Sequence, residues 1–429
     1  MTQYYFDYVA GADANDGLST GAPKKTVTAI AGLILAGNTL SLKRGIVWPQ
    51  DGTMGSRVLG INGKDLASVC TINDYGDAVA PPILDGLEYD NSATGWTHLG
   101  SGLWSKTHAD QITRVIYGGS TTNLSTGGLA YAGSTSTTAA KPWYWTAGTL
   151  HIYTGSTTDS PPVFYGGLAY FSMACDLAVR FRDSRNILVQ RLAVYGGALA
   201  AIDFQSGSTI GCVDIELDDV QALYCMKGIT LESDTANNSN ITLLRPVCDA
   251  KTDATENSGS STHWQNCDGI HASNNYDGLV VTNPTLTGFR HAGINIYDNV
   301  GYVPGTVVIS ADADYGVIDC SVIDYGRAIA SIGSIASQNV KISGMKSTGQ
   351  VTRTQLSGTC NISGCSWKTN RYDATVQGFE SSQVLWFQAW DLSPGNSKMV
   401  DVTVQNCLIE HPFSTPFGFL LGTATAGFY

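Results

Sequence analysis

The amino-acid sequence predicts an all-β fold, a right-handed, single-stranded parallel β-helix in which every turn of the chain stacks on the one before it. Charged residues make up only 14% of the 429 residues, 48 residues are glycine, and Ser, Thr, Asn and Asp lie between short apolar runs. This mixture is typical of short strands joined by tight turns. In addition, one short pattern recurs at coil-sized intervals and a second pattern aligns three segments. A solenoid can extend one core over a chain that would otherwise form two or three compact domains.

The recurring pattern has apolar residues at its first and third positions, Gly, Asn, Asp or Arg at the fifth, and a small or apolar residue at the sixth. Its instances begin at Ile187, Ile215, Ile241, Leu279, Tyr315, Val340, Cys360 and Val402. Intervals of 20 to 28 residues fit one coil of three short strands and three turns. Intervals of 36, 38 and 42 residues indicate coils with loop insertions, the last with room for an extra coil around residues 384–387.

The second pattern aligns the segments that begin at Gly228, Gly269 and Gly293. Each continues with an Ile that should point into the core, because strand residues alternate between faces. Thr230, His271 and Asn295 should then lie in a row on the outer face. Successive coils are about 4.8 Å apart, so the members of such a row are close enough to act on one substrate.

The charge balance limits the partners. A net charge of -12 and a pI near 4.9 disfavour nucleic acid and anionic membrane surfaces, which require clustered Lys and Arg. No apolar run is long enough for membrane insertion. A neutral sugar polymer is accommodated easily, whereas an acidic polymer requires a local basic patch. The chain starts at Met1 without an export signal, which predicts either a trimmed precursor or release by another route, such as lysis.

The ten cysteines include no Cys-x-x-Cys pair, so no zinc or redox site is predicted. Cys320, Cys365 and Cys407 share the sixth position of the repeat, which predicts reduced thiols in the interior rather than disulfides. The run from Asp13 to Gly17 has the residue types of a calcium loop but lacks the spacing of an EF-hand, and a turn is favoured. No cofactor or metal is predicted, although a structural or substrate-bridging calcium stays open.

The N-terminal third carries a family resemblance. Residues 4–30 (YYFDYVAGADANDGLSTGAPKKTVTAI), 36–45 (AGNTLSLKRG), 71–86 (TINDYGDAVAPPILDG) and 143–154 (WYWTAGTLHIYT) resemble right-handed β-helix proteins of the pectate-lyase-like superfamily, most of all bacteriophage tailspikes and depolymerases. The resemblance implies that residues 26–37 form a helix that caps the solenoid, where an open coil end would expose strand edges. It also implies an aromatic hairpin at residues 143–154.

The chain is therefore divided into an N-terminal strand with its capping helix (1–45), the first coils with the aromatic hairpin (46–180), and the main β-helix that carries the site (181–429). The lack of an export signal, the reduced cysteines and the Gly/Ser/Thr-rich composition favour the tailspike branch. That branch implies a homotrimer on a phage tail or baseplate. Such a spike folds in the host cytoplasm and acts outside the cell on a bacterial surface polysaccharide, meaning capsule, O-antigen or exopolysaccharide.

The candidate site lies around the two longest insertions of the middle of the chain, residues 249–266 and the segment after His291, because function often lies on loops that a rigid scaffold holds. The expected catalytic residues are Asp268, Glu256, His271 and His291, and the expected substrate-binding residues are Trp264, Arg290, Tyr297, Asp298, Asn295 and His263. Residues 266–269 (NCDG) resemble the NxDG element of polygalacturonases, whose Asp belongs to the acid/base set. Residues 290–293 loosely resemble the GHG element of that family, but its Asp-Asp pair and Arg-x-Lys element are missing.

Two mechanisms are open. Hydrolysis needs two carboxyls that flank the bond, and Asp268 could act with Glu256, Asp253, Asp249 or Asp298. β-Elimination needs a base and a cation beside a uronate carboxyl; His271 or His291 could serve together with Arg290, and Tyr297 is a further candidate. Simpler alternatives are that Asp268 is a turn residue, that His271 is a surface histidine, and that residues 290–291 belong to a solvated loop. Trp264, in a polar loop, is expected to stack on sugar.

Three functions follow. The favoured one is a polysaccharide depolymerase that hydrolyses glycosidic bonds, a phage tailspike. The second is a bacterial polysaccharide lyase, and the third is a carbohydrate-binding spike or adhesin without catalysis. The enzymes are preferred because histidines and carboxylates converge on adjacent coils, where a binder would carry mostly aromatic and amide side chains.

Overall fold

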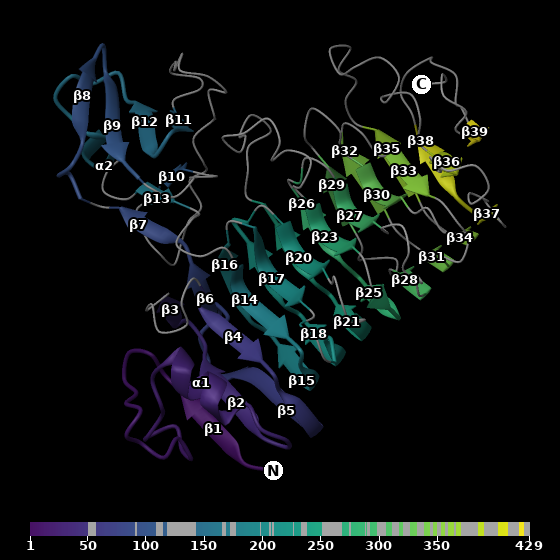
Figure 1. Cartoon of the computed structure of the whole chain (residues 1–429), viewed down its shortest axis with the longest axis horizontal. Coiled ribbons are helices and arrows are strands. Elements are labelled where there is room, and N and C mark those ends of the chain that lie inside the picture. The colour runs from purple at the N-terminus through teal and green to yellow at the C-terminus, as the bar shows by residue number, and fades with distance from the viewer. Residues whose placement is uncertain are drawn as a thin grey trace.

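The computed structural model describes residues 1–49, 57–90, 92–108, 115–117, 143–164, 169–171, 177–197, 199–205, 207, 210–225, 227–232, 238–250, 268–273, 276–287, 289, 292–297, 306–310, 317–320, 327–332, 339–343, 346–349, 353–356, 359–363, 366–369, 385–389, 402–410 and 420–423. These residues form a right-handed parallel β-helix with three long parallel sheets along its axis (Figure 1). The predicted fold class is therefore confirmed. Within the described residues, no helix has the length and apolar character to cross a membrane.

We name the three sheets A, B and C. Sheet A contains, in spatial order, β1 (Gln3–Phe6), β2 (Thr39–Lys43), β5 (Asp65–Tyr75), β15 (Arg185–Gln190), β18 (Val213–Asp218), β21 (Asn238–Leu244), β25 (Leu279–Thr282), β28 (Thr306–Ser310), β31 (Asn339–Ser343), β34 (Thr359–Ser363) and β37 (Val402–Gln405), with β24 (Tyr276–Asp277) paired to β21. Sheet B contains β3 (Val47–Pro49), β6 (Ile83–Gly86), β16 (Ala193–Gly196), β19 (Gln221–Leu223), β22 (Val247–Asp249), β26 (Thr285–Thr287), β29 (Val317–Cys320), β32 (Lys346–Gly349), β35 (Ser366–Thr369) and β38 (Leu408–Glu410). Sheet C contains β4 (Leu59–Asn62), β14 (Leu177–Arg182), β17 (Ala200–Gln205), β20 (Lys227–Glu232), β23 (Asp268–Ser273), β27 (Ala292–Tyr297), β30 (Arg327–Ile332), β33 (Arg353–Leu356), β36 (Leu385–Ala389) and β39 (Leu420–Thr423).

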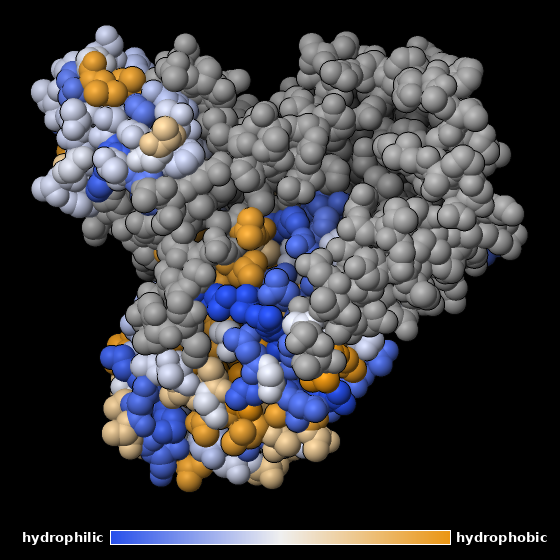
Figure 2. Space-filling view, viewed as in Figure 1, coloured by the Kyte–Doolittle hydropathy of each residue, from blue (hydrophilic) through white to orange (hydrophobic). Residues whose placement is uncertain are grey.

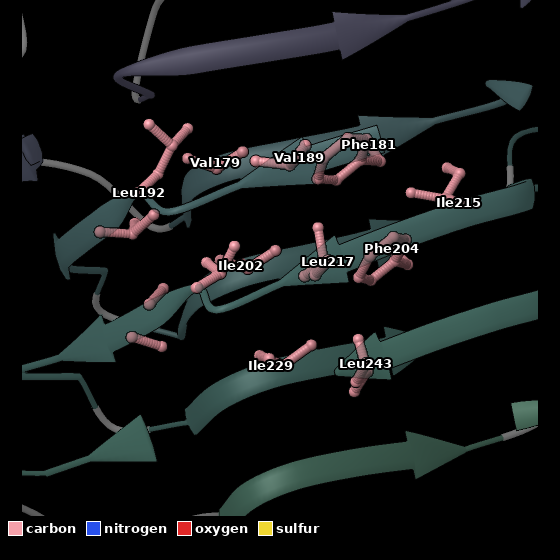
Figure 3. Packing of buried hydrophobic residues seen from close by; sticks show 14 of the residues in the cluster. Val179, Phe181, Val189, Leu192, Ile202, Phe204, Ile215, Leu217, Ile229 and Leu243 are labelled. Carbon is pink, nitrogen blue, oxygen red and sulfur yellow. The ribbon is translucent and has the colours of Figure 1, made fainter. Parts of the chain in front are cut away.

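Each coil passes through sheet C, then sheet A, then sheet B, and alternate residues of all three sheets point into one core. Phe181 and Phe204 stack inside it with ring centroids 4.9 Å apart, between Ile and Val side chains of sheet A (Figure 3). Similar apolar side chains stack at equivalent positions of successive coils, and this gives the solenoid a continuous interior.

The repeat marks sheet A. Seven of its eight predicted starts lie in this sheet, and Ile187, Ile215 and Ile241 are direct neighbours in it. The start at Tyr315 is wrong, because Val307 pairs with both Leu279 and Val340. The segment of β29 has a similar apolar alternation, which explains the wrong assignment. Its Cys320 lies in sheet B, paired with Gly349 of β32.

The 42-residue interval holds no extra coil. β34 pairs directly with β37 in sheet A, through Cys360 and Val402. The strand near residues 384–387 is β36, which is the sheet C strand of the same coil. The interval is therefore one enlarged coil.

The fifth position of the repeat has a conformational cause. Arg191, Asp219, Arg245, Asn283 and Asn406 all have φ between 50° and 55°, which places them in the left-handed region. They form the corner from sheet A to sheet B. The sixth-position residues that follow, such as Leu192 and Val220, turn into the core. Asn, Asp and Gly adopt this conformation at little cost, whereas Arg adopts it at about 1 kcal/mol.

The capping helix is shorter than predicted. α1 (Val27–Leu33) begins after Thr26, whose hydroxyl accepts from the backbone N–H of Ala29, and Val27 and Ile30 are buried in the core. It ends before a turn that places Gly37 at a φ of 75°. The carboxylate of Asp13 accepts from the backbone N–H groups of residues 25 and 26 and from the Thr26 hydroxyl, so it fastens the start of this helix.

A small antiparallel unit leaves the solenoid after β6 (Figure 1). It contains β7 (Glu88–Asp90), β8 (Thr97–Gly100), β9 (Leu103–Thr107), β10 (Val115–Tyr117), β11 (Trp143–Thr146), β12 (Thr149–Tyr153), α2 (Pro161–Phe164) and β13 (Ala169–Phe171). The expected aromatic hairpin is β11 and β12, with Trp143 opposite Ile152.

The cysteines with described side chains, Cys70, Cys212, Cys225, Cys248 and Cys407, form no disulfide with one another, and all but Cys407 are buried. Burial raises the pKa of Cys248 well above its ordinary value, so this thiol is inert. Of the three cysteines predicted to share the sixth position of the repeat, Cys407 is only partly buried, and the side chains of Cys320 and Cys365 lie outside the described residues.

Candidate functional site

The predicted row on the outer face of sheet C exists. Thr230, His271 and Asn295 are neighbours on β20, β23 and β27, and Ile229, Ile270 and Ile294 point into the core with 0% exposure. The row continues backwards to Asp203 on β17 and Arg180 on β14. Hydrophilic side chains gather over the middle of the β-helix in the view of Figure 2.

The central side chains of this row are buried, although they point away from the core. Asp203 is 4% exposed, Thr230 2%, His271 8% and Asn295 4%. Buried polar groups need partners, and these residues find them in one another. This makes the row an ordered site rather than a solvated strand face.

His271 is held by a buried carboxylate. Its Nδ1 lies 2.8 Å from Oδ2 of Asp268, which is 0% exposed, and the same oxygen accepts from Nδ2 of Asn295 at 3.0 Å. A carboxylate only accepts hydrogen bonds, so Nδ1 carries the ring proton. The lone pair of Nε2 is then available, which is the arrangement of an oriented general base.

An accessible ion pair lies beside this ring. Oε1 of Glu232 is 3.6 Å from Nε2 of His271 and 2.5 Å from Nζ of Lys227. The Glu232 side chain is 44% exposed, against 12% for Lys227 and 11% for His271. Burial works to raise the pKa of Glu232, but the positive charge of Lys227 and its hydrogen bond outweigh this effect and hold the pKa below its ordinary value.

The pKa of a second carboxyl, Asp203, is shifted in the opposite direction. Asp203 accepts a hydrogen bond from the hydroxyl of Thr230, yet burial raises its pKa to about 6, and the charge of Glu232 adds to this shift. Carboxyls whose environments displace their pKa values in opposite directions are typical of acid/base sites.

Of the predicted site residues, the structure brings Asp268, His271 and Asn295 together. Tyr297 is the neighbour of Ser273 on the adjacent strand, and its side chain lies outside the described residues. Glu256, His263, Trp264, Arg290, His291 and Asp298 also lie outside the described residues.

The sequence reasoning missed Asp203, Lys227 and Glu232. The signal was present, because residues 200–205 (AAIDFQ) and 227–232 (KGITLE) are in register. Extending the Gly-Ile alignment by one coil would have placed Asp203 next to Thr230.

The fold has solved neighbours. No protein-family model matches the sequence, and no curated protein is similar to it. Pectate lyase Pel9A superposes with a TM-score of 0.50 at 13% identity, over 95% of this chain and 79% of that one. A rhamnogalacturonan lyase gives a TM-score of 0.50 at 11% identity, over 99% and 87% of the two chains. The tailspike protein gp49 from Pseudomonas phage LKA1 gives 0.22 at 12% identity, over 93% and 76%. Identities this low show the fold alone, so function has to be argued from the site.

Proposed function

We propose that the chain is an enzyme that cleaves a polysaccharide, with His271 as the group that transfers the proton. The observation that supports this most is the pair of Asp268 and His271, in which a fully buried carboxylate orients the ring and leaves Nε2 as the basic atom. Such an arrangement fixes the tautomer and orientation of the ring and stabilises the imidazolium that forms when the base takes a proton. A non-catalytic adhesin has no need of it.

The chemistry that this geometry supports best is β-elimination on a uronate. Nε2 of His271 removes the proton α to the sugar carboxyl, the electron pair of that C–H bond forms a C=C bond, the C–O bond to the departing sugar breaks, and the departing oxygen takes a proton from the imidazolium or from solvent water. Asp268 stabilises the imidazolium. Lys227 is ion-paired to Glu232, whose carboxylate lies beside the ring, and among the described cations it is the group that would face the sugar carboxylate.

The carboxyls of the site fit hydrolysis less well. Hydrolysis by paired carboxyls requires two of them to flank the bond, about 5 to 9.5 Å apart. Asp268 and Asp203 are 0% and 4% exposed, and of the carboxyls described in this row only Glu232 is accessible. Asp268 therefore serves His271 in this proposal rather than the sugar.

Hydrolysis stays the second candidate because of the opposite pKa displacements of Asp203 and Glu232. A protonated Asp203 would be the acid and an ionised Glu232 the base or nucleophile. Glu256 and Asp298, outside the described residues, would be further carboxyls for this mechanism.

The biological setting that we propose is that of a phage tail spike that acts as a homotrimer on a bacterial surface polysaccharide. It rests on the sequence resemblance of residues 4–154 and on the buried cysteines, which form no disulfide with one another and so fit folding in a cytoplasm. Light scattering after gel filtration tests the trimer, and a monomeric mass would contradict that part of the proposal.

The test of the chemistry records new reducing ends and ultraviolet absorbance together, on a panel of neutral and uronate-containing bacterial polysaccharides. Elimination gives both signals, because its product is unsaturated, whereas hydrolysis gives reducing ends alone. Asp203→Asn separates the two further: it abolishes hydrolysis but leaves elimination within about threefold. Binding of a polymer without either signal would favour the adhesin.

A further inference from the structure

The arginines whose side chains the structure describes fall into two groups. Of the arginines whose side chains the structure describes, Arg44, Arg185, Arg191 and Arg245 each form an ion pair with an aspartate, and all lie on or next to strands of sheet A. Arg57, Arg180 and Arg182 make no such ion pair. These three lie together at the N-terminal end of sheet C, and we call them the arginine trio.

The topology brings the trio together. Arg180 and Arg182 are alternate residues of β14, so both point outward from the same strand, and Arg180 is the register partner of Gly60 on β4. Arg57 comes just before β4, and a Cβ on Gly60 would lie 4.0 Å from its Cδ. The Arg57 side chain therefore runs over the glycine toward Arg180.

Their charge is poorly compensated. Nε of Arg57 and Nε of Arg180 are buried without a hydrogen-bond partner. Burial, followed by the charges of Arg57 and Arg182, lowers the pKa of Arg180. Asp203 is the carboxyl that opposes this effect, and its own raised pKa of about 6 makes it a weak counterion below neutral pH. Three crowded guanidinium groups with free donors are suited to an anion.

We propose that the arginine trio is a subsite for an anionic group of the polysaccharide, a sugar carboxylate or a sulfate ester, remote from the cleavage centre. This inference rests on the proposed function, since it takes the ligand to be part of the chain that His271 cleaves. Arg180 and His271 belong to one row and are separated by three coil steps, which is about 14 Å at the usual coil spacing. The polymer then lies along sheet C, parallel to the axis of the solenoid.

The subsite determines what the enzyme accepts. The chain carries a net charge of -12, which repels acidic polymers in general. A local cationic subsite selects an anionic polymer against that background. Because the subsite lies several coils from His271, short fragments that reach only the cleavage centre should bind much more weakly than longer ones.

The test uses the full chain with His271→Ala, so that binding is measured without cleavage. The probes are polygalacturonate, alginate and chondroitin sulfate, each beside its carboxyl-reduced or desulfated form, in affinity electrophoresis and titration calorimetry. We expect at least one anionic polymer to bind and its neutralised form to bind at least tenfold more weakly. Weaker binding after carboxyl reduction shows that the trio holds a carboxylate, and weaker binding after desulfation shows that it holds a sulfate ester.

The variants are Arg180→Gln combined with Arg182→Gln, with Arg245→Gln as the ion-paired control. The double variant should lower affinity for the anionic polymer at least tenfold, and the control should leave it within twofold. Equal affinity in the double variant, or equal binding of the neutralised polymer, would overturn the subsite, as would binding of none of the anionic polymers.

Thermal unfolding separates recognition from a structural role. Removing charge from an uncompensated trio should leave the melting temperature unchanged or raise it, whereas a fall of several degrees would show that the arginines stabilise the fold instead. Arginine-dependent binding by a chain that cleaves nothing would support the subsite and contradict the proposed function. Cleavage that depends on His271 but not on the trio would support the proposed function and contradict the subsite.

Discussion

The buried carboxyl of Asp85 should make the stability of the fold depend on pH. Asp85 lies on β6, where the chain is about to leave the solenoid for the small antiparallel unit, and it is 0% exposed. One carboxylate oxygen accepts from the backbone N–H of Leu87 at 3.0 Å, and Oδ2 has no hydrogen-bond partner. The groups beside it are the phenol of Tyr195, its register partner, and Tyr224, whose ring meets that of Tyr195 at 5.2 Å.

Burial raises the pKa of Asp85 from 3.8 to about 7. The acid is therefore protonated in the folded chain at pH values where it is ionised in the unfolded chain. The folded state binds more protons, so stability falls as the pH rises from about 4 to about 7. A displacement of about three pKa units corresponds to about 4 kcal/mol.

Asp85→Asn keeps the shape and the acceptor but cannot ionise. We compare the free energy of unfolding of the variant with that of wild type at each pH, by urea unfolding followed through tryptophan fluorescence. Between pH 4 and pH 8 this difference should shift by about 4 kcal/mol in favour of the variant. Asp77→Asn, in an exposed turn, is the control and should follow wild type at every pH. Parallel pH profiles of wild type and Asp85→Asn would refute the argument.

Three further changes test the site and the core. Asp268→Asn removes the acceptor that keeps the proton of His271 on Nδ1, so kcat should fall on the order of 10³-fold with KM little changed, as steady-state kinetics would show; an unchanged kcat would mean that the pair is structural. Gly228→Ala places a Cβ 2.4 Å from the backbone oxygen of Gly269, and urea unfolding should show a loss of about 3 kcal/mol. Phe204→Ala removes a fully buried ring that stacks on Phe181. It should cost about 4 kcal/mol in the same assay, and a cost under 1 kcal/mol would contradict the continuous core.

The fold was predictable because each coil repeats one local requirement. A left-handed residue must turn the corner from sheet A to sheet B, and a small or apolar residue must then enter the core. Residues such as Asp219 and Asn283 meet the first requirement, so the sequence shows the corner directly. The false start at Tyr315 arose because two sheets of one coil carry similar alternation, and a pattern of a few residues does not say which sheet it belongs to.

Of the site, the sequence could predict only the residues on the aligned segments that begin at Gly228, Gly269 and Gly293. The row of Thr230, His271 and Asn295 follows from register alone. The burial of that row and the partnership of Asp268 with Nδ1 of His271 depend on side-chain rotamers at a strand end, which no sequence spacing encodes. The carboxyls that the sequence offers, such as Asp268 and Glu256, favour hydrolysis, and the sequence alone does not show that Asp268 is buried against His271.

The cleavage rate of His271→Ala, on the polysaccharide that the wild-type chain cleaves best, tests whether His271 transfers the proton. His98→Asn, on the small antiparallel sheet, is the matched histidine control. We expect His271→Ala to lose at least 10³-fold in kcat while still binding the polymer, and the control to keep its full rate. A His271→Ala chain that cleaves at the wild-type rate would contradict this role of His271.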